Sequence, residues 1–447
     1  MLLTHWLRNL AHMLQRRATR RYSSPARRRL PNCRGIHEVE ILEDRSLLSV
    51  ITVDVATDEL DGNINDGDVS LRDAIAAANA GDTITFNPAQ MGSSTIILTL
   101  GQLTIDKSLT IDGESNGITI DAQGNSRIFT IDDGNFTPDQ TVSLSGLTIT
   151  GGNDDFGAGI SNRENLSVTD STVTGNSATG DGGGIFNRGT LDLSQSNVSG
   201  NSAYYGGGLS NSSTGTATVS SSTFSNNLGQ RSGGGIDNRS VGGTLTLNDS
   251  TLSGNTSNAG AGLFNEINAT TTIRNSRFSD NYTSGGGGGI FNNGTATVAN
   301  STISGNTGGY GGAGIHNIRN LTLTNSTLTL NYSPYKGGGF LNSGTATVTN
   351  STVVNNTGYY GGGIYNEGGT TTVRNSIITG NISDNGPDVR GSFMSNAHNV
   401  IGNTSSSSGF GGTDDIGTNP ADVIELTLAN NGGLTLTLAL VDSPTNP

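Results

Sequence analysis

Three carboxylates that precede two successive glycine-rich runs are candidates for catalysis or metal binding. Asp154 and Asp155 precede one run, and Asp181 precedes the next. Two or three carboxylates about 5–10 Å apart can act as the acid and base of glycoside cleavage or as ligands for Ca²⁺. A solvated acidic corner would have the same composition. The sequence therefore assigns neither a catalytic residue nor a metal to these acids.

Tyrosine is the second residue type with a recurrent spacing. Tyr310, Tyr335 and Tyr360 recur at a constant interval and are expected to form a stripe, and Tyr205 lies in the same loop of an earlier repeat. An exposed stripe of this kind could stack on sugar rings or contact a protein partner. The alternative, which stays open, is that the tyrosines pack on one another and stiffen the loop.

Other catalytic patterns do not stand out in the sequence. It contains no Ser/His/Asp constellation and no His/Cys spacing of a metal site. The glycine runs lack the lysine and the strand-to-helix context of a phosphate loop. His316 occupies a position that varies among the repeats. No cofactor is expected, and the sequence favours a chain without catalysis over an enzyme.

Two short phrases position these residues by recurring in step. The first is a glycine-rich run, an apolar residue, one variable residue and Asn; the second is Ser, two residues, Ser or Thr, one residue and Asn. A fixed period predicts stacked structural repeats with one coil per period. The first phrase ends, at nearly constant intervals, at Asn162, Asn187, Asn211, Asn238, Asn265, Asn292, Asn317, Asn342 and Asn366.

Each period contains three short runs in which apolar and small polar residues alternate. Alternation with period two, rich in Thr, Val and Ile, predicts β-strands rather than helices. Three strand-and-turn units per period predict a triangular coil, and stacked coils form a parallel β-helix whose equivalent strands pair at about 4.8 Å. We therefore expect an all-β, single-stranded, right-handed parallel β-helix (solenoid) of about 12 or more coils, with the hand set by the chirality of parallel crossovers.

Glycine and asparagine are expected to have separate structural roles. The glycine runs at Gly182, Gly206 and Gly361 are expected to form corners with positive φ or close contact between coils. Equivalent asparagines are expected to form ladders of amide hydrogen bonds along the axis and are interpreted as scaffold. A further ladder is expected at Asn275, Asn300, Asn325, Asn350 and Asn375.

Composition and charge argue against several classes of function. The chain has 447 residues with 67 glycines and only 5% aromatic residues, which suits a solenoid with a narrow core. Residues 1–49 carry ten Arg and four acidic residues (net +6), whereas residues 50–447 carry 13 basic and 33 acidic residues (net −20). The acidic body is expected to repel nucleic acid and anionic membranes. No stretch suits a membrane span, and a monomer is expected.

The N-terminal residues resemble a segment of exported proteins. Leu42–Ser49 resembles the LEPR-xLL-type motif of large bacterial surface proteins, with Asp44 at the position of the motif's proline. This resemblance implies export. Residues 1–49 are accordingly interpreted as a basic, disordered leader, and the remainder is expected outside the cell or on its surface.

A short helix is expected between the first strand and the coils. Leu71, Ile75 and Ala78 follow helical spacing. Ser70 is the expected N-cap and Gly81 the expected C-terminal stop. The helix would cover the open end of the β-helix, where unpaired strand edges invite aggregation. The same segment resembles the CSLREA segment that opens many bacterial β-helix proteins.

The C-terminal part resembles the choice-of-anchor Q family, in which three segments follow a β-helix in a fixed order. The matching segments here are Gly386–Val389, Ser395–Gly402 and Asn430–Leu440. The repeats also resemble the GGAI and FxxN repeats of polymorphic outer-membrane proteins, since Phe224–Asn227 and Phe278–Asn281 fit FxxN. These resemblances imply a secreted, adhesin-like β-helix.

The sequence divides the chain into four parts: a leader (1–49), a cap with the first irregular coils (50–150), regular repeats (151–385) and a C-terminal end of choice-of-anchor Q type (386–447). The expected function is structural or adhesin-like, at the cell surface and without catalysis. The alternatives are a carbohydrate-active enzyme (a polysaccharide lyase or hydrolase) and a polysaccharide-binding module without chemistry. The expected partner is a polysaccharide or a cell-surface protein.

Overall fold

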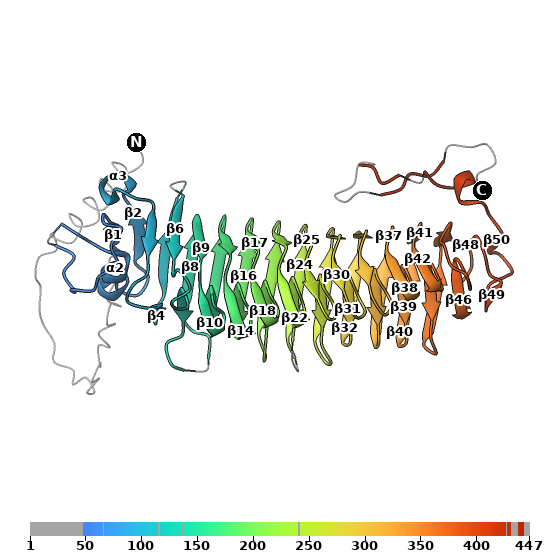
Figure 1. Ribbon diagram of the computed structural model, residues 1–447, viewed down its shortest axis with the longest axis horizontal. Helices are drawn as coiled ribbons and strands as arrows, with labels where there is room; N and C mark the ends of the chain where they lie inside the picture. Colours follow the sequence, from blue (N-terminus) through green and yellow to red (C-terminus); the bar gives the residue numbers. More distant parts are fainter. Residues whose placement is uncertain are drawn as a thin grey trace, which may run out of the picture. The chain divides into compact units, whose positions relative to one another are not determined.

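The alternating apolar and polar residues of each repeat form short parallel β-strands, which stack into a solenoid of about 13 turns (Figure 1). The computed structural model describes residues 48–65, 67–114, 117–135, 137–239, 242–425, 427–430 and 437–441. Almost all of the predicted leader, and residues 431–436 within the last predicted C-terminal motif, lie outside this description. The all-β, parallel prediction is confirmed.

Three long sheets and one shorter sheet form the walls of the solenoid. Each strand pairs in parallel with its equivalents in the neighbouring coils, so the strands of one sheet come from different repeats. Sheet A runs from β1 (Val50–Val53) to β47 (Met394–Ser395), sheet B from β3 (Thr95–Ile97) to β50 (Asp415–Ile416), and sheet C from β4 (Leu103–Ile105) to β49 (Ser406–Ser408).

A regular coil contains four strands rather than the three predicted. β11 (Ile160–Asn162), β12 (Asn165–Thr169) and β13 (Thr172–Thr174) occupy the three predicted runs. The loop before the next glycine run forms a fourth strand, because it is long enough to pair with its equivalents. The fourth strands form sheet D: β10 (Asn153–Phe156), β14 (Ser177–Asp181), β18 (Ser202–Tyr205), β22 (Leu228–Ser232), β26 (Thr256–Ser257), β30 (Tyr282–Thr283), β34 (Thr307–Gly308), β38 (Tyr332–Lys336) and β42 (Thr357–Tyr360).

The core is a column of inward-facing aliphatic side chains. In the coil that starts at β11, Ile160, Leu166, Val168 and Val173 are at most 2% exposed. Equivalent positions in the other coils are also apolar and buried, because every second residue of a strand faces inward. Each coil therefore buries its apolar side chains against the coils on either side.

Two buried asparagine ladders run along the axis, as predicted. Asn255 Nδ2 donates to Asn281 Oδ1 at 3.0 Å in one ladder, and Asn292 Nδ2 donates to Asn317 Oδ1 at 2.7 Å in the other. The Oδ1 atom of Asn281 also accepts the backbone N–H of Asn255 at 3.0 Å. These side-chain amides are thus paired inside the protein, where an unpaired amide would be costly.

The further asparagine ladder lies at the surface and has a second role. Asn300 Nδ2 donates to Asn275 Oδ1, and Asn325 Nδ2 to Asn300 Oδ1, both at 3.2 Å. The φ angles at the five positions of this ladder lie between 46° and 52°. Asn adopts this left-handed conformation more readily than most residues. The predicted positive φ at the glycine corners is also confirmed, with 67° at Gly182 and 63° at Gly206.

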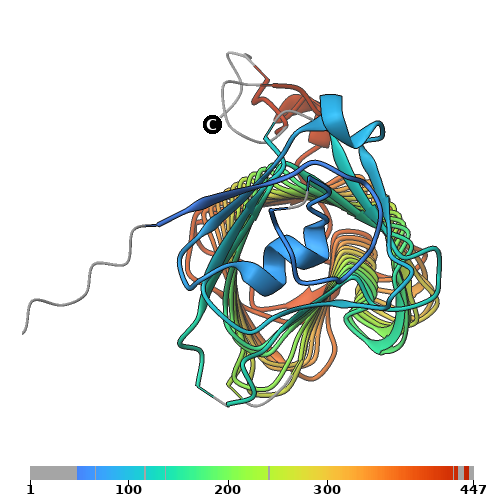
Figure 2. The ribbon, with the colours of Figure 1, turned by 90° about the vertical axis from the view of Figure 1, so that its left-hand side faces the viewer.

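Helix α2 (Leu71–Ala77) lies across the N-terminal end of the coils (Figure 2), as expected of a cap. The Ser70 side chain accepts the N–H of Asp73, so the predicted N-cap is confirmed. The predicted stop at Gly81 is wrong, since the backbone already leaves the helical conformation at Ala78. A second short helix, α3 (Pro88–Met91), follows β2 (Thr83–Phe86) and was not predicted.

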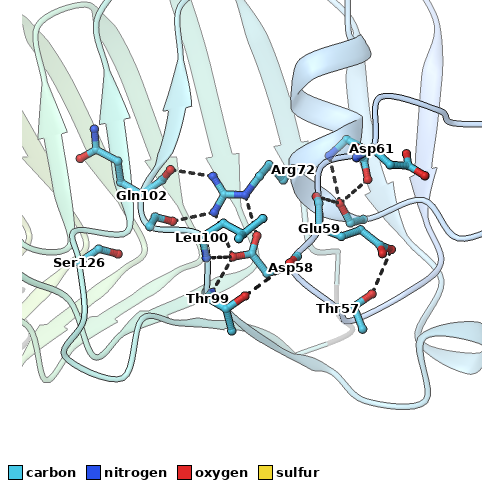
Figure 3. A network of polar contacts seen from close by, with 12 residues as sticks. Thr57, Asp58, Glu59, Asp61, Arg72, Thr99, Leu100, Gln102 and Ser126 are labelled. Atoms are coloured by element: carbon cyan, nitrogen blue, oxygen red, sulfur yellow. Dashed lines mark hydrogen bonds and ion pairs between the residues drawn. The ribbon is translucent and has the colours of Figure 1, made fainter.

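Arg72 on α2 connects the cap to the first coils (Figure 3). Its Nε atom donates to Asp58 Oδ1 at 2.7 Å. Its terminal nitrogens donate to the carbonyl oxygens of Gly101 and Gln102 at 2.6 and 2.9 Å. Burial acts to raise the pKa of Asp58, but hydrogen bonds from Arg72 and from backbone N–H groups, including that of Thr99, lower it. The carboxylate therefore stays charged, and the ion pair fixes the cap.

The C-terminal part ends one of the buried ladders. Asn381, the last asparagine of that ladder, donates its backbone N–H and its Nδ2–H to Asp388 Oδ1, both at 2.9 Å. Further along, Val423 and Ile424 form a small apolar cluster with Val354. The predicted segment that contains Asp388 thus supplies a terminal acceptor for the ladder.

Ile315→Asp is expected to destabilise the protein by at least about 3 kcal/mol, because Ile315 is fully buried and an unpaired charge would replace it. Urea denaturation followed by circular dichroism measures the change. Thr322→Asp is the matched control, since Thr322 lies on the exposed face of β36 (Asn320–Thr324). Equal destabilisation by the two substitutions would show that the inward and outward positions are wrongly assigned.

Asn306→Ala is expected to cost about 2–3 kcal/mol. The substitution removes the acceptor of two hydrogen bonds from Asn281, at 3.1 and 2.9 Å, and leaves those buried donors unpaired. The same experiment on Asn293→Ala, a half-buried position outside the buried ladders, gives the comparison. A loss of stability no larger than that of Asn293→Ala would contradict a structural role for the ladder.

Candidate functional site

The outward side chains of sheet C form a continuous row along the solenoid. The middle residue of each strand faces away from the core and is in register with its equivalents in the adjacent coils. We call this set the outer row of sheet C: Ser161, Phe186, Ser210, Asp237, Phe264, Phe291, His316, Leu341, Tyr365 and Arg390.

Sheet D lies beside this row and forms the second side of a groove. Phe186, Asp237 and Leu341 of the outer row are at most 3% exposed, so neighbouring segments cover them. We call the space between the outer row of sheet C and sheet D the C–D groove. One hollow in it is lined by Tyr205, Arg231, Ser232, Arg239, Asn258, Ala259, Phe264 and Glu266. Another hollow lies over sheet C and the turn that follows it, and is lined by Tyr365, Asn366, Glu367, Gly368, Arg390, Gly391 and Ser406.

Aromatic rings pack on one another along the outer row. The rings of Phe264 and Phe291 stack with centroids 4.9 Å apart, and the ring of His316 lies 4.7 Å from that of Phe291. Burial lowers the pKa of His316 to about 4, so this histidine is neutral at physiological pH. The row therefore gives the groove an apolar floor in these coils.

The predicted tyrosine stripe exists, but with a different third member. The rings of Tyr310 and Tyr335 lie 6.4 Å apart and are 56% and 57% exposed. Lys336 pairs in register with Tyr360, which places Tyr335 opposite Tyr359. The prediction of Tyr360 in this stripe is wrong because the coil step from Lys336 to Tyr360 is one residue shorter than the preceding step from Gly311 to Lys336. The exposed stripe is Tyr310, Tyr335 and Tyr359.

Tyr360 instead lies with cations and aromatic residues of the groove. The guanidinium of Arg390 lies 4.7 Å from the centre of the Tyr360 ring and 5.4 Å from that of Tyr365. Lys336 lies 5.6 Å from the Tyr310 ring and forms an ion pair with Glu367. Tyr310, Tyr335 and Tyr359 are thus exposed, whereas Tyr360 packs against Arg390 inside the groove.

Tyr205 belongs to a second cluster of the same groove. The guanidinium of Arg239 lies 3.6 Å from the centre of its ring and forms an ion pair with Asp181 at 2.6 Å. Burial raises the pKa of Asp181, although Arg239 acts in the opposite direction. The structure therefore places two predicted site residues, Tyr205 and Asp181, on one arginine.

The predicted acidic cluster does not converge. Asp154 forms an ion pair with Arg127 at 2.7 Å, and Asp155 accepts a hydrogen bond from Thr179 at 2.5 Å. Asp181 is paired with Arg239 instead. Within the described residues, these three acids do not form a group whose oxygen atoms could share one ion. Asp181 is buried beside Arg239 in the groove, whereas Asp155 is exposed.

Asp237 is a groove residue that the sequence did not indicate. It is 1% exposed, and its Oδ2 accepts a hydrogen bond from Ser232 at 2.6 Å. No group of the described residues pairs with its Oδ1. Burial raises the pKa of Asp237 to about 7. On sequence grounds this acid is isolated, because its coil neighbours are Ser210 and Phe264. Ser232 comes within hydrogen-bond distance only because the strands of sheet D lie beside sheet C.

Comparison with known families assigns the hand of the solenoid. A family model described as "Right handed beta helix region" matches residues 207–378. The solenoid is a right-handed parallel β-helix. The finer resemblances to choice-of-anchor Q proteins and polymorphic outer-membrane proteins stay predictions. Within the described residues, no helix has the length and apolar composition needed to cross a membrane.

Solved structures with a similar architecture are distant. A pectate lyase, Pel9A, is 13% identical, with 85% of this β-helix chain and 84% of the lyase covered at a TM-score of 0.40. Tailspike protein 3 of bacteriophage CBA120 is 10% identical, with 78% and 56% covered at a TM-score of 0.39. ORF18 of Geobacillus virus E2 is 12% identical, with 78% and 61% covered at a TM-score of 0.29. No curated protein sequence matches the chain significantly.

Asp237→Asn is expected to stabilise the β-helix above neutral pH. Burial raises the pKa of this acid from 3.8 to about 7, so the folded state holds a proton that the unfolded state releases. The stabilisation is complete below pH 3.8 and is lost as the pH rises through about 7. The loss is on the order of 4 kcal/mol at about 1.4 kcal/mol per pKa unit, and Asn avoids it.

Thermal unfolding of both proteins between about pH 4.5 and pH 8.5 measures this effect. The melting temperature of Asp237→Asn should exceed that of the wild type increasingly as the pH rises to about 7, and the difference should then stay constant. Asp192→Asn, which removes one negative charge from an exposed position, should show no such trend. The same pH dependence in all three proteins would contradict a buried, protonated Asp237.

Proposed function

We propose that this chain is an exported, surface-associated β-helix that binds an extended anionic polysaccharide along the C–D groove, in an adhesin-like role without catalysis. The observation that carries the proposal is the repeated pairing of a cation with an aromatic ring in the groove. The pairs and their distances are Arg188 with Phe186 (4.8 Å), Arg239 with Tyr205 (3.6 Å), Lys336 with Tyr310 (5.6 Å) and Arg390 with Tyr360 (4.7 Å).

The charge distribution supports an anionic ligand. Residues 50–447 carry a net charge of −20, and five of their 13 basic residues lie along the groove. These five are Arg188, Arg231, Arg239, Lys336 and Arg390. An anionic chain would be repelled by most of the surface, so attraction confined to one groove would orient it along the axis.

The exposed tyrosines support recognition of sugar rings. Tyr310, Tyr335 and Tyr359 are 48–57% exposed, although large apolar faces are usually covered. Coils repeat at about 4.8 Å, so equivalent rings recur along the axis as sugar rings recur along a polysaccharide. A flat ring face and a polar hydroxyl suit contact with a sugar at a wet surface.

The second candidate is a carbohydrate-active enzyme that works in the same groove. The pKa of Asp237, which burial raises to about 7, favours it, because a carboxyl group that is protonated near neutral pH can act as a general acid. However, Asp237 is only 1% exposed, so a bound sugar would not reach its carboxyl group. Binding without bond cleavage is therefore the function that the geometry supports better.

The triple substitution Tyr310→Ser, Tyr335→Ser and Tyr359→Ser is expected to weaken binding to polygalacturonate at least about tenfold, since each lost ring contact contributes about 1 kcal/mol. Isothermal titration calorimetry measures the affinity, with a neutral glucan as comparison ligand. Binding should also weaken between about 50 and 500 mM NaCl, because salt screens the groove cations.

Tyr332→Ser is the matched control. Tyr332 is 50% exposed on sheet D, but threonines are its register partners in both adjacent coils. The affinity of the Tyr332→Ser protein for polygalacturonate should equal that of the wild type. Unchanged binding by the triple variant, with a normal circular dichroism spectrum, would exclude the stripe as the contact. Polyuronate turnover that disappears in Asp181→Asn would instead establish the enzyme.

A further inference from the structure

A separate group of acids lies where the first irregular coils meet the regular repeats. Asp132 and Asp133 follow β7 (Phe129–Ile131), at the start of the loop that leads to β8 (Thr141–Ser145). Glu164 precedes β12 on the next coil. One carboxylate oxygen of each acid lies within 4.8 Å of the other two. The fold thus brings together acids from two separate segments of the sequence.

Among these three acids, Glu164 has a carboxylate oxygen whose hydrogen-bonding capacity the protein leaves unused. Its side chain is fully buried, and Oε2 accepts the backbone N–H groups of Asp139 and Gln140 at 3.0 and 3.1 Å. Oε1 is buried and has no hydrogen-bond partner in the described part of the chain. Such an oxygen is costly unless it meets a proton or a cation.

Nearby side chains order the loop but neutralise the group only in part. Arg163 lies 3.3 Å from Asp132 Oδ2. The side-chain amide of Gln140 donates to both Asp133, at 3.4 Å, and Asp139, at 2.9 Å. The backbone N–H of Asn135 donates to Asp133 Oδ1 at 2.9 Å. One guanidinium therefore faces several carboxylates.

We propose that Asp132, Asp133 and Glu164 bind a Ca²⁺ ion. Carboxylate oxygens are hard ligands, which suit Ca²⁺ and Mg²⁺ rather than softer metals. Ca²⁺ accepts six to eight oxygen ligands in irregular geometry, whereas Mg²⁺ demands a near-ideal octahedron and usually keeps several waters. Three protein carboxylates from two coils, whose oxygens lie within 4.8 Å of one another, therefore suit Ca²⁺ better. The bound Ca²⁺ pairs with the buried oxygen of Glu164.

The site would join two coils at a long connection. Glu164 already holds the loop from Asp132 to Gln140 through two backbone N–H groups. A shared ion would tie the start of the same loop to the adjacent coil. In each later regular coil the position equivalent to Glu164 is occupied by a residue without a carboxylate, as at Gly189 and Gly294. The regular repeats therefore lack this ion-binding position.

Calorimetric titration of the full-length, chelator-treated protein with CaCl₂ tests the proposal. We expect one Ca²⁺ per chain, binding more tightly than Mg²⁺, and a higher melting temperature with Ca²⁺. Asp133→Asn and Glu164→Gln should each raise the Kd at least about tenfold, because each removes a charged ligand. Asp192→Asn changes the charge equally at an exposed site and should leave the Kd unchanged.

Two results would overturn the Ca²⁺ site. The first is the absence of stoichiometric Ca²⁺ binding; Glu164→Gln should then fold normally without any response to Ca²⁺. The second is an unchanged Kd in both ligand variants. If Glu164→Gln fails to fold, the Kd of Asp133→Asn for Ca²⁺ still tests the proposal, because Asp133 is partly exposed. Polysaccharide binding is measured separately, so either proposal can fail alone.

Discussion

Hydrogen bonding between equivalent positions of successive coils is the constraint on which the rest of this structure depends. It fixes the register of all four sheets, and the register then decides which side chains meet. The buried asparagines require the same register, because Asn281 must lie opposite both Asn255 and Asn306 to form its two side-chain hydrogen bonds. A residue's chemistry in this protein is therefore set mainly by what lies one coil away rather than by its neighbours in sequence.

Sheet D shows how the same constraint creates a groove. The fourth strand of each coil leaves the core wall, pairs with its equivalents and returns at a glycine corner such as Gly206, where φ is 63°. The outer row of sheet C is thereby covered on one side without becoming part of the aliphatic core. Polar and charged groups, including Arg239 and Asp181, can then be partly desolvated beside aromatic rings, which strengthens their electrostatic interactions.

The sequence predicted the features that repeat and missed those that depend on a single coil. The asparagine ladders, the positive φ at Gly182 and the N-cap at Ser70 were predicted because each has a local physical cause that recurs or has a known sequence signature. Tyr360 was misplaced because one coil step is shorter by a residue. The environments of Asp237 and Glu164 were missed because they arise from the fold-back of sheet D and from one irregular loop, neither of which leaves a periodic signal.

The direction of the amide ladders has a consequence for how such a chain can change in length. In the two buried ladders, each asparagine gives its Nδ2–H to the coil that follows and accepts from the coil that precedes, so the buried amide dipoles all point the same way. One end of the ladder therefore always presents surplus donors, which Asp388 accepts here. Duplicating or deleting one whole coil keeps donors and acceptors balanced and leaves both ends untouched. Solenoids of this kind can accordingly grow or shrink in whole coils while their terminal segments stay the same.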